Sequence, residues 1–230
     1  MLEAGTPLDR YAYGDRPLRE EIVQVVAENL AVVTRNLYGA LVLNSSRCMF
    51  IDVDFADKGA VPKSGLFRRL LGKSAAAGPE EGALQSIREC AGRRPDLGMR
   101  IYRTRAGLRG LVTNRTFDPA APESIDLLND IGSDPLYIRL CQAQACFRAR
   151  LTPKPWRCGL RPPATRYPLL TADAQQRFNR WRAEYERVIL GFGVCQFVEH
   201  VGRADVHPEV RQMLALHDQF ACARSDRPLA

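Results

Sequence analysis

The sequence predicts an α+β fold: a mixed, mostly antiparallel sheet built from hairpins, with helices packed on its faces. Short apolar runs typical of strands are interleaved with helical patterns along the chain. Most neighbouring strands are separated only by short turn segments, which favours hairpins over the long crossovers of a parallel sheet. The chain has 230 residues, 46% of them hydrophobic, which is enough for a substantial core. We expect a single α+β domain over residues 1–230.

The first part of the chain is expected to contain a helix and a hairpin. Residues 17–37 carry apolar side chains at helical spacing, which predicts a helix. Residues 38–43 and 48–55 are apolar runs that predict two strands, and the polar residues 44–46 between them are typical of a turn. The segments that follow are predicted as a loop over 58–65, an amphipathic helical pattern over 66–71 and a flexible linker or exposed loop over 72–82.

The second part of the chain alternates between helical and strand patterns. We predict a helix over 81–94, strands over 99–104 and 108–113 around a turn at 105–107, two short helices within 121–144, a half-buried strand over 146–151, an exposed basic loop over 152–168, a helix over 171–191, a strand over 194–202 and a helix over 207–220. Asp134 before Pro135 is a helix start, and Thr171 or Asp173 starts the long helix. We expect a catalytic-type core over 38–151, with a helix–strand–helix unit over 168–222 packed on it.

Composition limits the classes of function. The net charge of +7 permits binding to a polyanion and is equally compatible with a solvated basic surface. The seven cysteines are scattered singly, which indicates reduced thiols. Neither a signal peptide nor an apolar run of about 20 residues is visible, so we expect a cytoplasmic protein without membrane segments.

A zinc site is not favoured by the spacing of the possible ligands. The combinations considered are Cys141, Cys146 and Cys158, or Cys195 with His200 and His207. Neither set has the spacing of a four-ligand site, and buried single thiols are commoner.

Asp52 and Asp54 are the first candidate site, because they end an apolar strand. Residues i and i+2 of a strand share a face, so both carboxylates project together. Their repulsion costs about 1 kcal/mol in water at 4 Å and more where they are partly buried, and a cation between them reverses its sign. A Mg²⁺ or Mn²⁺ ion suits such oxygen ligands and would serve phosphoryl transfer. The alternative is that both aspartates lie on the solvated face of the sheet.

The predicted hairpin around residues 105–107 collects cations and small residues: Arg103, Thr104, Arg105, Gly107 and Arg109. Glycine permits close approach of a ligand or a backbone, and guanidinium groups match phosphate geometry. The alternative is a basic hairpin tip on the surface.

A second basic segment follows the strand over 146–151. Arg148 and Arg150 alternate with apolar residues, and Lys154, Trp156 and Arg157 follow in the loop. Cations interleaved with an aromatic ring suit a single strand of nucleic acid, since bases stack on rings while cations contact phosphates. Two alternatives remain: the tryptophan anchors the loop to the core, or the arginines neutralise the two aspartates in an ion-pair cluster without metal.

The strand with Asp52 and Asp54, followed some fifty residues later by the hairpin with Thr104 and Gly107, resembles the archaeo-eukaryotic primase superfamily of primases and primase-polymerases. The resemblance covers roughly residues 38–151. The resemblance implies an RRM-like core, with Asp52 and Asp54 as metal-binding catalytic carboxylates. It implies nucleotide-binding roles for Thr104, Arg105, Gly107 and Arg109, with nucleoside triphosphate and DNA or RNA as partners. Contacts to phosphates or nucleic acid are expected from Arg103, Arg148, Arg150, Lys154, Trp156 and Arg157.

The sequence departs from the family pattern in two places. Arg109 stands where the family has a histidine that contacts the triphosphate. The third carboxylate of the family has no counterpart on the strand over 146–151; Asp126 and Asp130 are helical, and Glu199 is a candidate only if its strand folds back. We therefore expect a primase-polymerase-like nucleotidyltransferase. The alternatives are a catalytically inactive relative that binds nucleic acid or a protein, and a different metal-dependent phosphoryl-transfer or nuclease domain.

Overall fold

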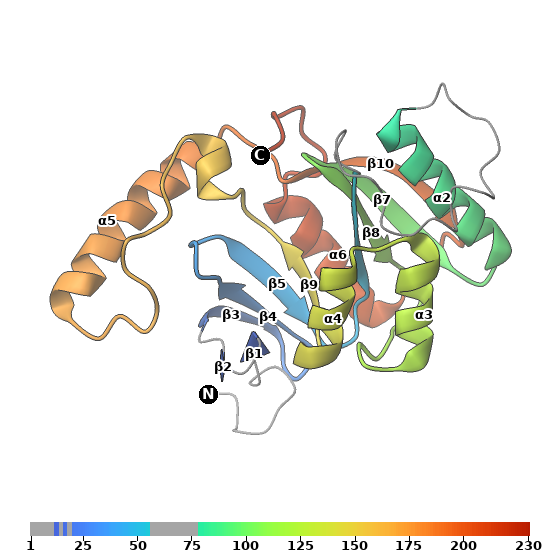
Figure 1. Cartoon of the computed structure of the whole chain (residues 1–230), viewed down its shortest axis with the longest axis horizontal. Helices are drawn as coiled ribbons and strands as arrows, with labels where there is room; N and C mark the ends of the chain where they lie inside the picture. Colours follow the sequence, from blue (N-terminus) through green and yellow to red (C-terminus); the bar gives the residue numbers. More distant parts are fainter. Residues whose placement is uncertain (1–11, 14–15, 18–19, 56–77) are drawn as a thin grey trace.

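The computed structural model describes residues 12–13, 16–17, 20–55 and 78–230. Within these ranges the chain forms two four-stranded antiparallel sheets and five α-helices (Figure 1). The predicted α+β class is therefore confirmed, although the strands build two four-stranded sheets and one two-stranded ribbon instead of a single sheet.

The elements follow one another along the described chain. The strands are β1 (Ala12–Tyr13), β2 (Arg16–Pro17), β3 (Glu21–Ala27), β4 (Ala31–Arg35), β5 (Leu41–Ser45), β6 (Phe50–Asp54), β7 (Gly98–Thr104), β8 (Gly107–Val112), β9 (Phe147–Arg150) and β10 (Cys195–Gly202). The helices are α2 (Pro79–Arg93), α3 (Pro122–Ile131), α4 (Pro135–Gln144), the short 3₁₀ turn η1 (Pro155–Cys158), α5 (Ala172–Ile189) and α6 (Pro208–Phe220). Sheet I has the strand order β10-β7-β8-β6, sheet II has the order β3-β4-β5-β9, and β1 pairs with β2.

The helix predicted over residues 17–37 is wrong, because this segment forms the antiparallel hairpin of β3 and β4. Its apolar spacing fits one face of a helix, but the segment is rich in valine, which favours strands. Asn29 lies between the strands and has a φ of 56°, a left-handed conformation that asparagine tolerates better than most residues. All five residues of β4 are buried, as expected for an inner strand.

The hairpin predicted between residues 38–43 and 48–55 is also wrong. β5 pairs with β4 and β9 in sheet II, whereas β6 pairs with β8 in sheet I. Asn44 is fully buried in β5, where its amide donates to backbone and side-chain oxygens of sheet II. The Ser45 hydroxyl accepts from the backbone N–H of Cys48, so the chain bends here from one sheet into the other.

Most later elements agree with their sequence patterns. The exception is the exposed loop predicted over 152–168: its start is buried at Thr152, Pro153 and Pro155, and η1 lies within it. The side chain of Asp134 accepts from the backbone N–H of Leu136, and Pro135 is the first residue of α4. Thr171 caps α5 by accepting from the N–H of Ala174.

Part of one linker prediction is corrected. The loop predicted over 58–65, the helical pattern over 66–71 and most of the linker over 72–82 lie outside the described residues. The end of that linker is helical, since α2 begins at Pro79.

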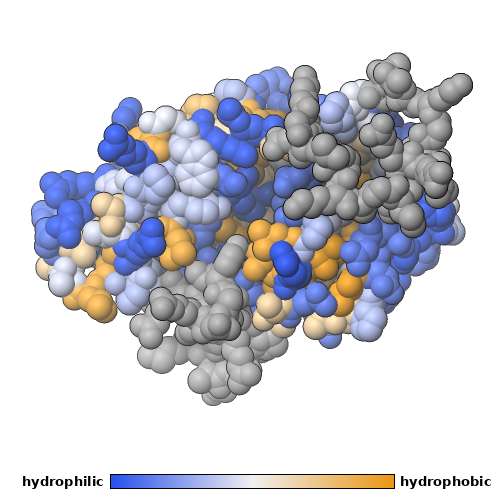
Figure 2. All heavy atoms as spheres, in the orientation of Figure 1, coloured by the Kyte–Doolittle hydropathy of each residue, from blue (hydrophilic) through white to orange (hydrophobic). Residues whose placement is uncertain are grey.

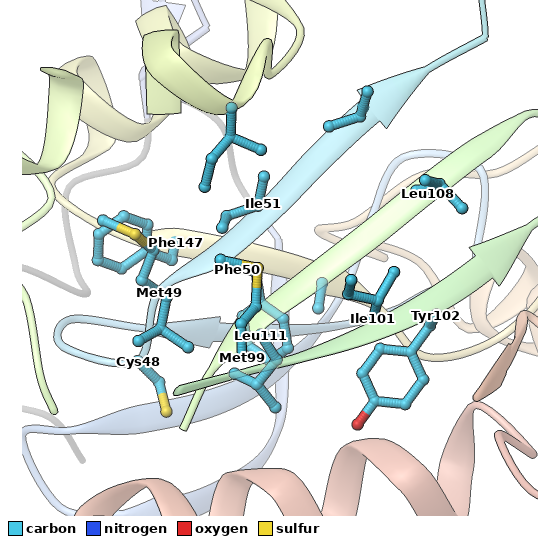
Figure 3. Close-up of a cluster of buried hydrophobic side chains, with 14 of the residues drawn as sticks. Cys48, Met49, Phe50, Ile51, Met99, Ile101, Tyr102, Leu108, Leu111 and Phe147 are labelled. Atoms are coloured by element: carbon cyan, nitrogen blue, oxygen red, sulfur yellow. The ribbon is translucent and has the colours of Figure 1, made fainter. Parts of the chain in front are cut away.

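The core is shared between the two sheets. Figure 3 shows the fully buried side chains of Phe50, Ile101 and Leu111 from sheet I beside Phe147 from sheet II. Each such side chain contributes about 2–3 kcal/mol through apolar burial. Both faces of β6 are buried where the strand starts, since Phe50 and Ile51 are each 0% exposed, and exposure appears only toward its end, at Asp52 and Asp54.

The sheets meet at their edge strands β6 and β9, and α4 covers the junction. The Tyr137 hydroxyl donates to the Phe50 carbonyl oxygen at 3.0 Å and accepts from the Arg148 N–H at 3.3 Å. The backbone N–H of Asp134 donates to the Asp52 carbonyl oxygen at 2.8 Å. One helix end therefore occupies the open side of β6 and links it to β9.

The C-terminal elements complete sheet I. β10 pairs with β7, and α6 packs on the sheet with Val210 and Met213 fully buried. The Tyr102 side chain points from β7 toward α6 (Figure 3). α5 projects to one side (Figure 1), and hydrophilic residues gather over that end of the molecule in Figure 2. Across the described ranges, every helix is too short or too polar to pass through a lipid bilayer.

Candidate functional site

A cleft of about 410 Å³ lies at the junction of the two sheets. This volume is within the range of small-molecule pockets, about 300–1,000 Å³. Sheet I and the start of α4 form an acidic wall, and sheet II with the segment after β9 forms a basic wall. The acids of the first wall are Asp52, Asp54 and Asp134, and the cations of the second are Arg148, Arg150, Lys154 and Arg157. Two lining residues carry the opposite charge to their wall: Arg109 on sheet I and Glu20 beside Arg148.

Asp52 and Asp54 occupy the predicted face of β6. Ile51 and Val53, which alternate with them, are buried, and both carboxylates line the cleft. Asp52 is half-buried and Asp54 is exposed near the mouth of the cleft. The sequence prediction that both acids project from one face of the strand agrees with this placement.

Asp134 is held beside this pair by the edge of β6. The Ser133 hydroxyl and the Asp134 N–H both donate to the Asp52 carbonyl oxygen, at 2.9 and 2.8 Å. One carboxylate oxygen of Asp134 caps α4. In the part of the chain that the structure describes, no three His, Cys, Asp or Glu side chains are grouped so as to hold a metal ion. A cation between Asp52 and Asp54 would therefore take its remaining ligands from water or a bound molecule.

The acidic wall carries unfavourable charge. Partial burial, followed by the carboxylates of Asp52 and Asp134, raises the pKa of Asp54 above its usual value. Lys154 and Arg157 oppose this shift from across the cleft. The ionised form of Asp54 is therefore destabilised in the folded protein, which is the condition that a bound cation relieves.

The cations of the basic wall also repel one another. Burial, and then Arg150 and Arg157, lower the pKa of Lys154. Arg150, Lys154 and Arg157 form no ion pair within 4 Å with a carboxylate of the described residues, and the Arg150 Nε is buried without a hydrogen-bond partner there. The predicted ion-pair cluster between these cations and the two aspartates is therefore not formed at contact distance.

Arg148 lines the cleft, whereas Trp156 lies outside its lining, beside the lining residues Tyr38 and Lys154. The Arg148 Nη2 pairs with both carboxylate oxygens of Glu20, at 2.9 and 3.1 Å, and Glu20 is only 4% exposed. The Trp156 ring is half exposed; it meets the Tyr38 ring edge-on at 5.1 Å, and Lys154 Nζ lies 5.6 Å from its centroid. An aromatic pair with a cation beside it thus stands at the rim of the cleft.

The hairpin tip between β7 and β8 borders the cleft. The Thr104 hydroxyl is buried and donates to the Gly107 carbonyl oxygen at 3.1 Å. A Cβ atom on Gly107 would lie 2.1 Å from the Val53 carbonyl oxygen, so this glycine accommodates the neighbouring strand. Arg105 is exposed at the tip, and Arg103 is directed to the other face of the sheet, where it pairs with a glutamate of α2 at 3.0 Å.

Gly107→Ala is expected to destabilise the protein by about 1–3 kcal/mol, because a backbone oxygen cannot move aside without breaking the β6–β8 pairing. Urea denaturation measures the change. Gly82→Ala in α2 is the matched control, since a Cβ at Gly82 meets nothing within 4 Å and alanine favours helix by about 1 kcal/mol. Equal stability of the two variants would contradict the assigned contact.

Arg109 is buried in the floor of the cleft, directly opposite Asp52 in the strand register. Its Nη1 donates to the Arg150 carbonyl oxygen at 2.9 Å and lies 3.2 Å from His217 Nε2. Since arginine can only donate, Nε2 must accept, and the proton of the neutral ring is on Nδ1, which donates to Asp218 at 3.2 Å. Arg109 therefore joins the two sheets and α6, and both N–H groups of its Nη1 are engaged within the protein.

Several cleft residues were not found from the sequence. Asp134 was assigned only as a helix cap, and Tyr38 and Glu20 carried no motif. One sequence feature could have indicated Asp134. It is an acid in a loop before a helix, and it lies between two predicted site segments, the β7–β8 hairpin and β9. Glu199, considered as a third acid, pairs with Arg88 at 2.8 Å on β10, at the edge of sheet I opposite β6.

The chain was also compared with known proteins. No family model, no curated protein and no solved structure matches it.

Proposed function

We propose that this protein is a primase-polymerase-like nucleotidyltransferase. It binds a nucleoside triphosphate with Mg²⁺ or Mn²⁺ in the cleft between its sheets and joins the nucleotide to a strand of DNA or RNA. The observation that carries the proposal is that three carboxylates, Asp52, Asp54 and Asp134, line the same cavity as three cations, Arg150, Lys154 and Arg157, which have no ion pair within 4 Å among the described residues.

Charge complementarity is the physical support. The carboxylates of Asp52, Asp54 and Asp134 repel one another, and so do the cations facing them. A divalent metal bound to a triphosphate presents a cation to the first group and phosphate oxygens to the second. A single ligand thus relieves both repulsions, whereas a free anion or a free cation relieves one.

The residues have separate roles in this proposal. Asp52 and Asp54 would hold the metal, and a metal held there would supply neutralisation of the negative charge of the phosphates. Arg150, Lys154 and Arg157 contact the phosphates. Arg109 positions the Arg150 backbone instead of gripping the triphosphate as the sequence suggested.

The aromatic rim supports a nucleotide over a simple polyphosphate. Tyr38 lines the cleft and Trp156 presents half of its surface beside it. Exposed rings next to a phosphate site favour stacking of a base, worth about 1–3 kcal/mol.

A second candidate function is a binding module without catalysis. It is favoured by the lack of a three-ligand metal group among the described side chains and by the internal engagement of Arg109. Such a protein would bind nucleic acid in a salt-dependent manner without requiring a metal.

The test combines thermal shift with extension of a primed template and priming on an unprimed one, using all four triphosphates and Mg²⁺ or Mn²⁺. We expect metal and triphosphate together to raise Tm by about 5–10 °C at 100-fold excess over Kd, and labelled primer to lengthen. Triphosphate binding that is independent of metal, with no extension under any condition, would leave the binding module as the function.

A further inference from the structure

A second hollow lies on the other side of the hairpin tip. It has a volume of about 280 Å³ and is lined by Arg103, Arg105 and Arg227, with Gln196 and Asp226 among the remaining residues. Thr104 lines both hollows, so only the tip of the β7–β8 hairpin separates them.

Cations form a continuous series from the cleft to this hollow. Burial first, and then the charges of Arg150 and Arg105, lower the pKa of Arg157, so Arg150 and Arg105 each lie near Arg157. Arg105 also lines the second hollow. The charge that begins on the basic wall of the cleft therefore extends over the hairpin tip.

Two arginines of this series are available to a ligand. Arg105 and Arg227 are exposed, and neither has an ion pair within 4 Å among the described residues. Arg227 contacts the Cys222 sulfur at 3.2 Å, and Asp226 is the acid of the hollow. Arg103 is already paired with Glu80.

The two hollows differ in chemistry. The main cleft has an aromatic rim in Tyr38 and Trp156, whereas the described lining of the second hollow contains no aromatic residue. Bases stack on aromatic rings and backbone phosphates contact arginines, so a strand laid across the tip would place its bases in the first and a phosphate in the second. Unpaired bases are required for such stacking, which favours a single strand over a duplex.

We propose that a single strand of nucleic acid crosses the hairpin tip, with bases at the aromatic rim of the main cleft and a backbone phosphate held by Arg105 and Arg227 in the second hollow. This inference rests on the proposed function, because it identifies where the nucleic-acid strand lies to which the nucleotide is added. It makes the second hollow a strand subsite that a free triphosphate does not need.

The experiment compares a double variant, Arg105→Glu with Arg227→Glu, with the wild-type chain. The probes are a labelled short oligothymidylate, the same strand as a duplex, and a labelled nucleoside triphosphate with Mn²⁺, each titrated at several salt concentrations. We expect oligothymidylate affinity to fall at least about tenfold. The slope of log K against log salt should become shallower by about 0.7 for each lost phosphate contact. Triphosphate affinity should fall by a clearly smaller factor than strand affinity, since Arg227 lines only the second hollow, whereas Arg105 is also close enough to Arg157 to act on its charge.

The matched control is a double variant with the same charge change outside both hollows, Arg93→Glu with Arg211→Glu; both residues are exposed. It should bind oligothymidylate much more tightly than the test variant. The proposal is overturned if the two double variants weaken the strand equally, if triphosphate affinity falls as far as strand affinity, or if duplex binds tighter than single strand with the same dependence on Arg105 and Arg227.

The outcomes also separate this inference from the proposed function. If the protein incorporates nucleotides but its affinity for the strand is unchanged in the Arg105→Glu, Arg227→Glu variant, the subsite is refuted and the transferase is retained. Strand binding through these arginines without triphosphate binding would support the subsite and refute the transferase.

Discussion

Asp54→Asn is expected to abolish nucleotide incorporation while it makes the metal-free protein more stable. The loss of activity should reach about 10³-fold, or about 4 kcal/mol of transition-state stabilisation, because a metal-holding charge is removed. Stability should rise because the ionised carboxylate, whose pKa is raised by partial burial, Asp52 and Asp134, is unfavourable in the folded state. Because Asp54 is exposed to solvent, which screens these charges, the gain in stability is at most about 1 kcal/mol, or roughly 3 °C in Tm.

Two further variants make this result interpretable. Asp52→Asn should lose activity to a similar extent. Asp126→Asn, at an exposed acid of α3 outside the cleft, should leave both activity and Tm near wild type. Full activity in Asp54→Asn would refute the metal-holding role, and a fall in its metal-free Tm would refute the described crowding of carboxylates.

His217→Ala is expected to lower the free energy of unfolding by about 3–5 kcal/mol, since it leaves a cavity and strands two charged neighbours. His217 is fully buried between α6 and sheet I, where it accepts from Arg109 and donates to Asp218. Asp218 in turn accepts from the Tyr102 hydroxyl at 2.7 Å and pairs with Arg100 at 3.2 Å. Urea denaturation at neutral pH measures the loss.

The same histidine should make stability depend on pH. Burial, with a contribution from Arg109, lowers the pKa of His217 to about 4, against about 6.5 in an unfolded chain. Between these values the unfolded chain binds a proton that the folded chain excludes, so acid favours unfolding. This group alone should remove about 3 kcal/mol as pH falls from 7 to 4. Near pH 4, Asp54 partly offsets this loss of stability. Its pKa is raised in the folded protein, so the folded chain binds a proton there more readily than the unfolded chain does.

His217→Gln is the control for both effects. A glutamine amide offers an acceptor to Arg109 and a donor to Asp218 but does not titrate. It should be more stable than His217→Ala and should lose the pH dependence between about 6.5 and 4. An unchanged pH profile in His217→Gln would assign the acid sensitivity to other groups.

Local sequence signals predicted the fold where neighbouring residues decide the structure. Asp134 and Pro135 begin α4 as expected, and β7 and β8 pair across their predicted turn. The alternation of Asp52 and Asp54 with buried neighbours could also be read directly, because the strand period alone fixes which side chains share a face.

The failures arose where distant strands decide the structure. The apolar spacing of residues 17–37 suits a helix or a hairpin, and burial of β4 between β3 and β5 selects the hairpin. The bend at Ser45 looks like a hairpin turn in sequence, yet β9 and β8, which are remote in the chain, provide the partners of β5 and β6.

The candidate site was predictable only in part, for the same reason. Asp52, Asp54, Arg150, Lys154 and Arg157 were identified from composition and period, and all of them line one cleft. Asp134 reaches it only through the docking of α4 on β6, and Arg109 is drawn into the floor by His217, which lies more than one hundred residues away in the chain. No local pattern encodes either event.

The docking of α4 also governs how this molecule behaves toward its own copies. An unpaired strand edge offers a ready template for intermolecular β-pairing. If apolar side chains covered the edge of β6, its two acids would no longer be accessible to a ligand. Here Ser133, Asp134 and Tyr137 occupy the free main-chain groups of Phe50 and Asp52. The junction therefore keeps the acidic strand open to a ligand at its side chains while closing it to self-association at its backbone.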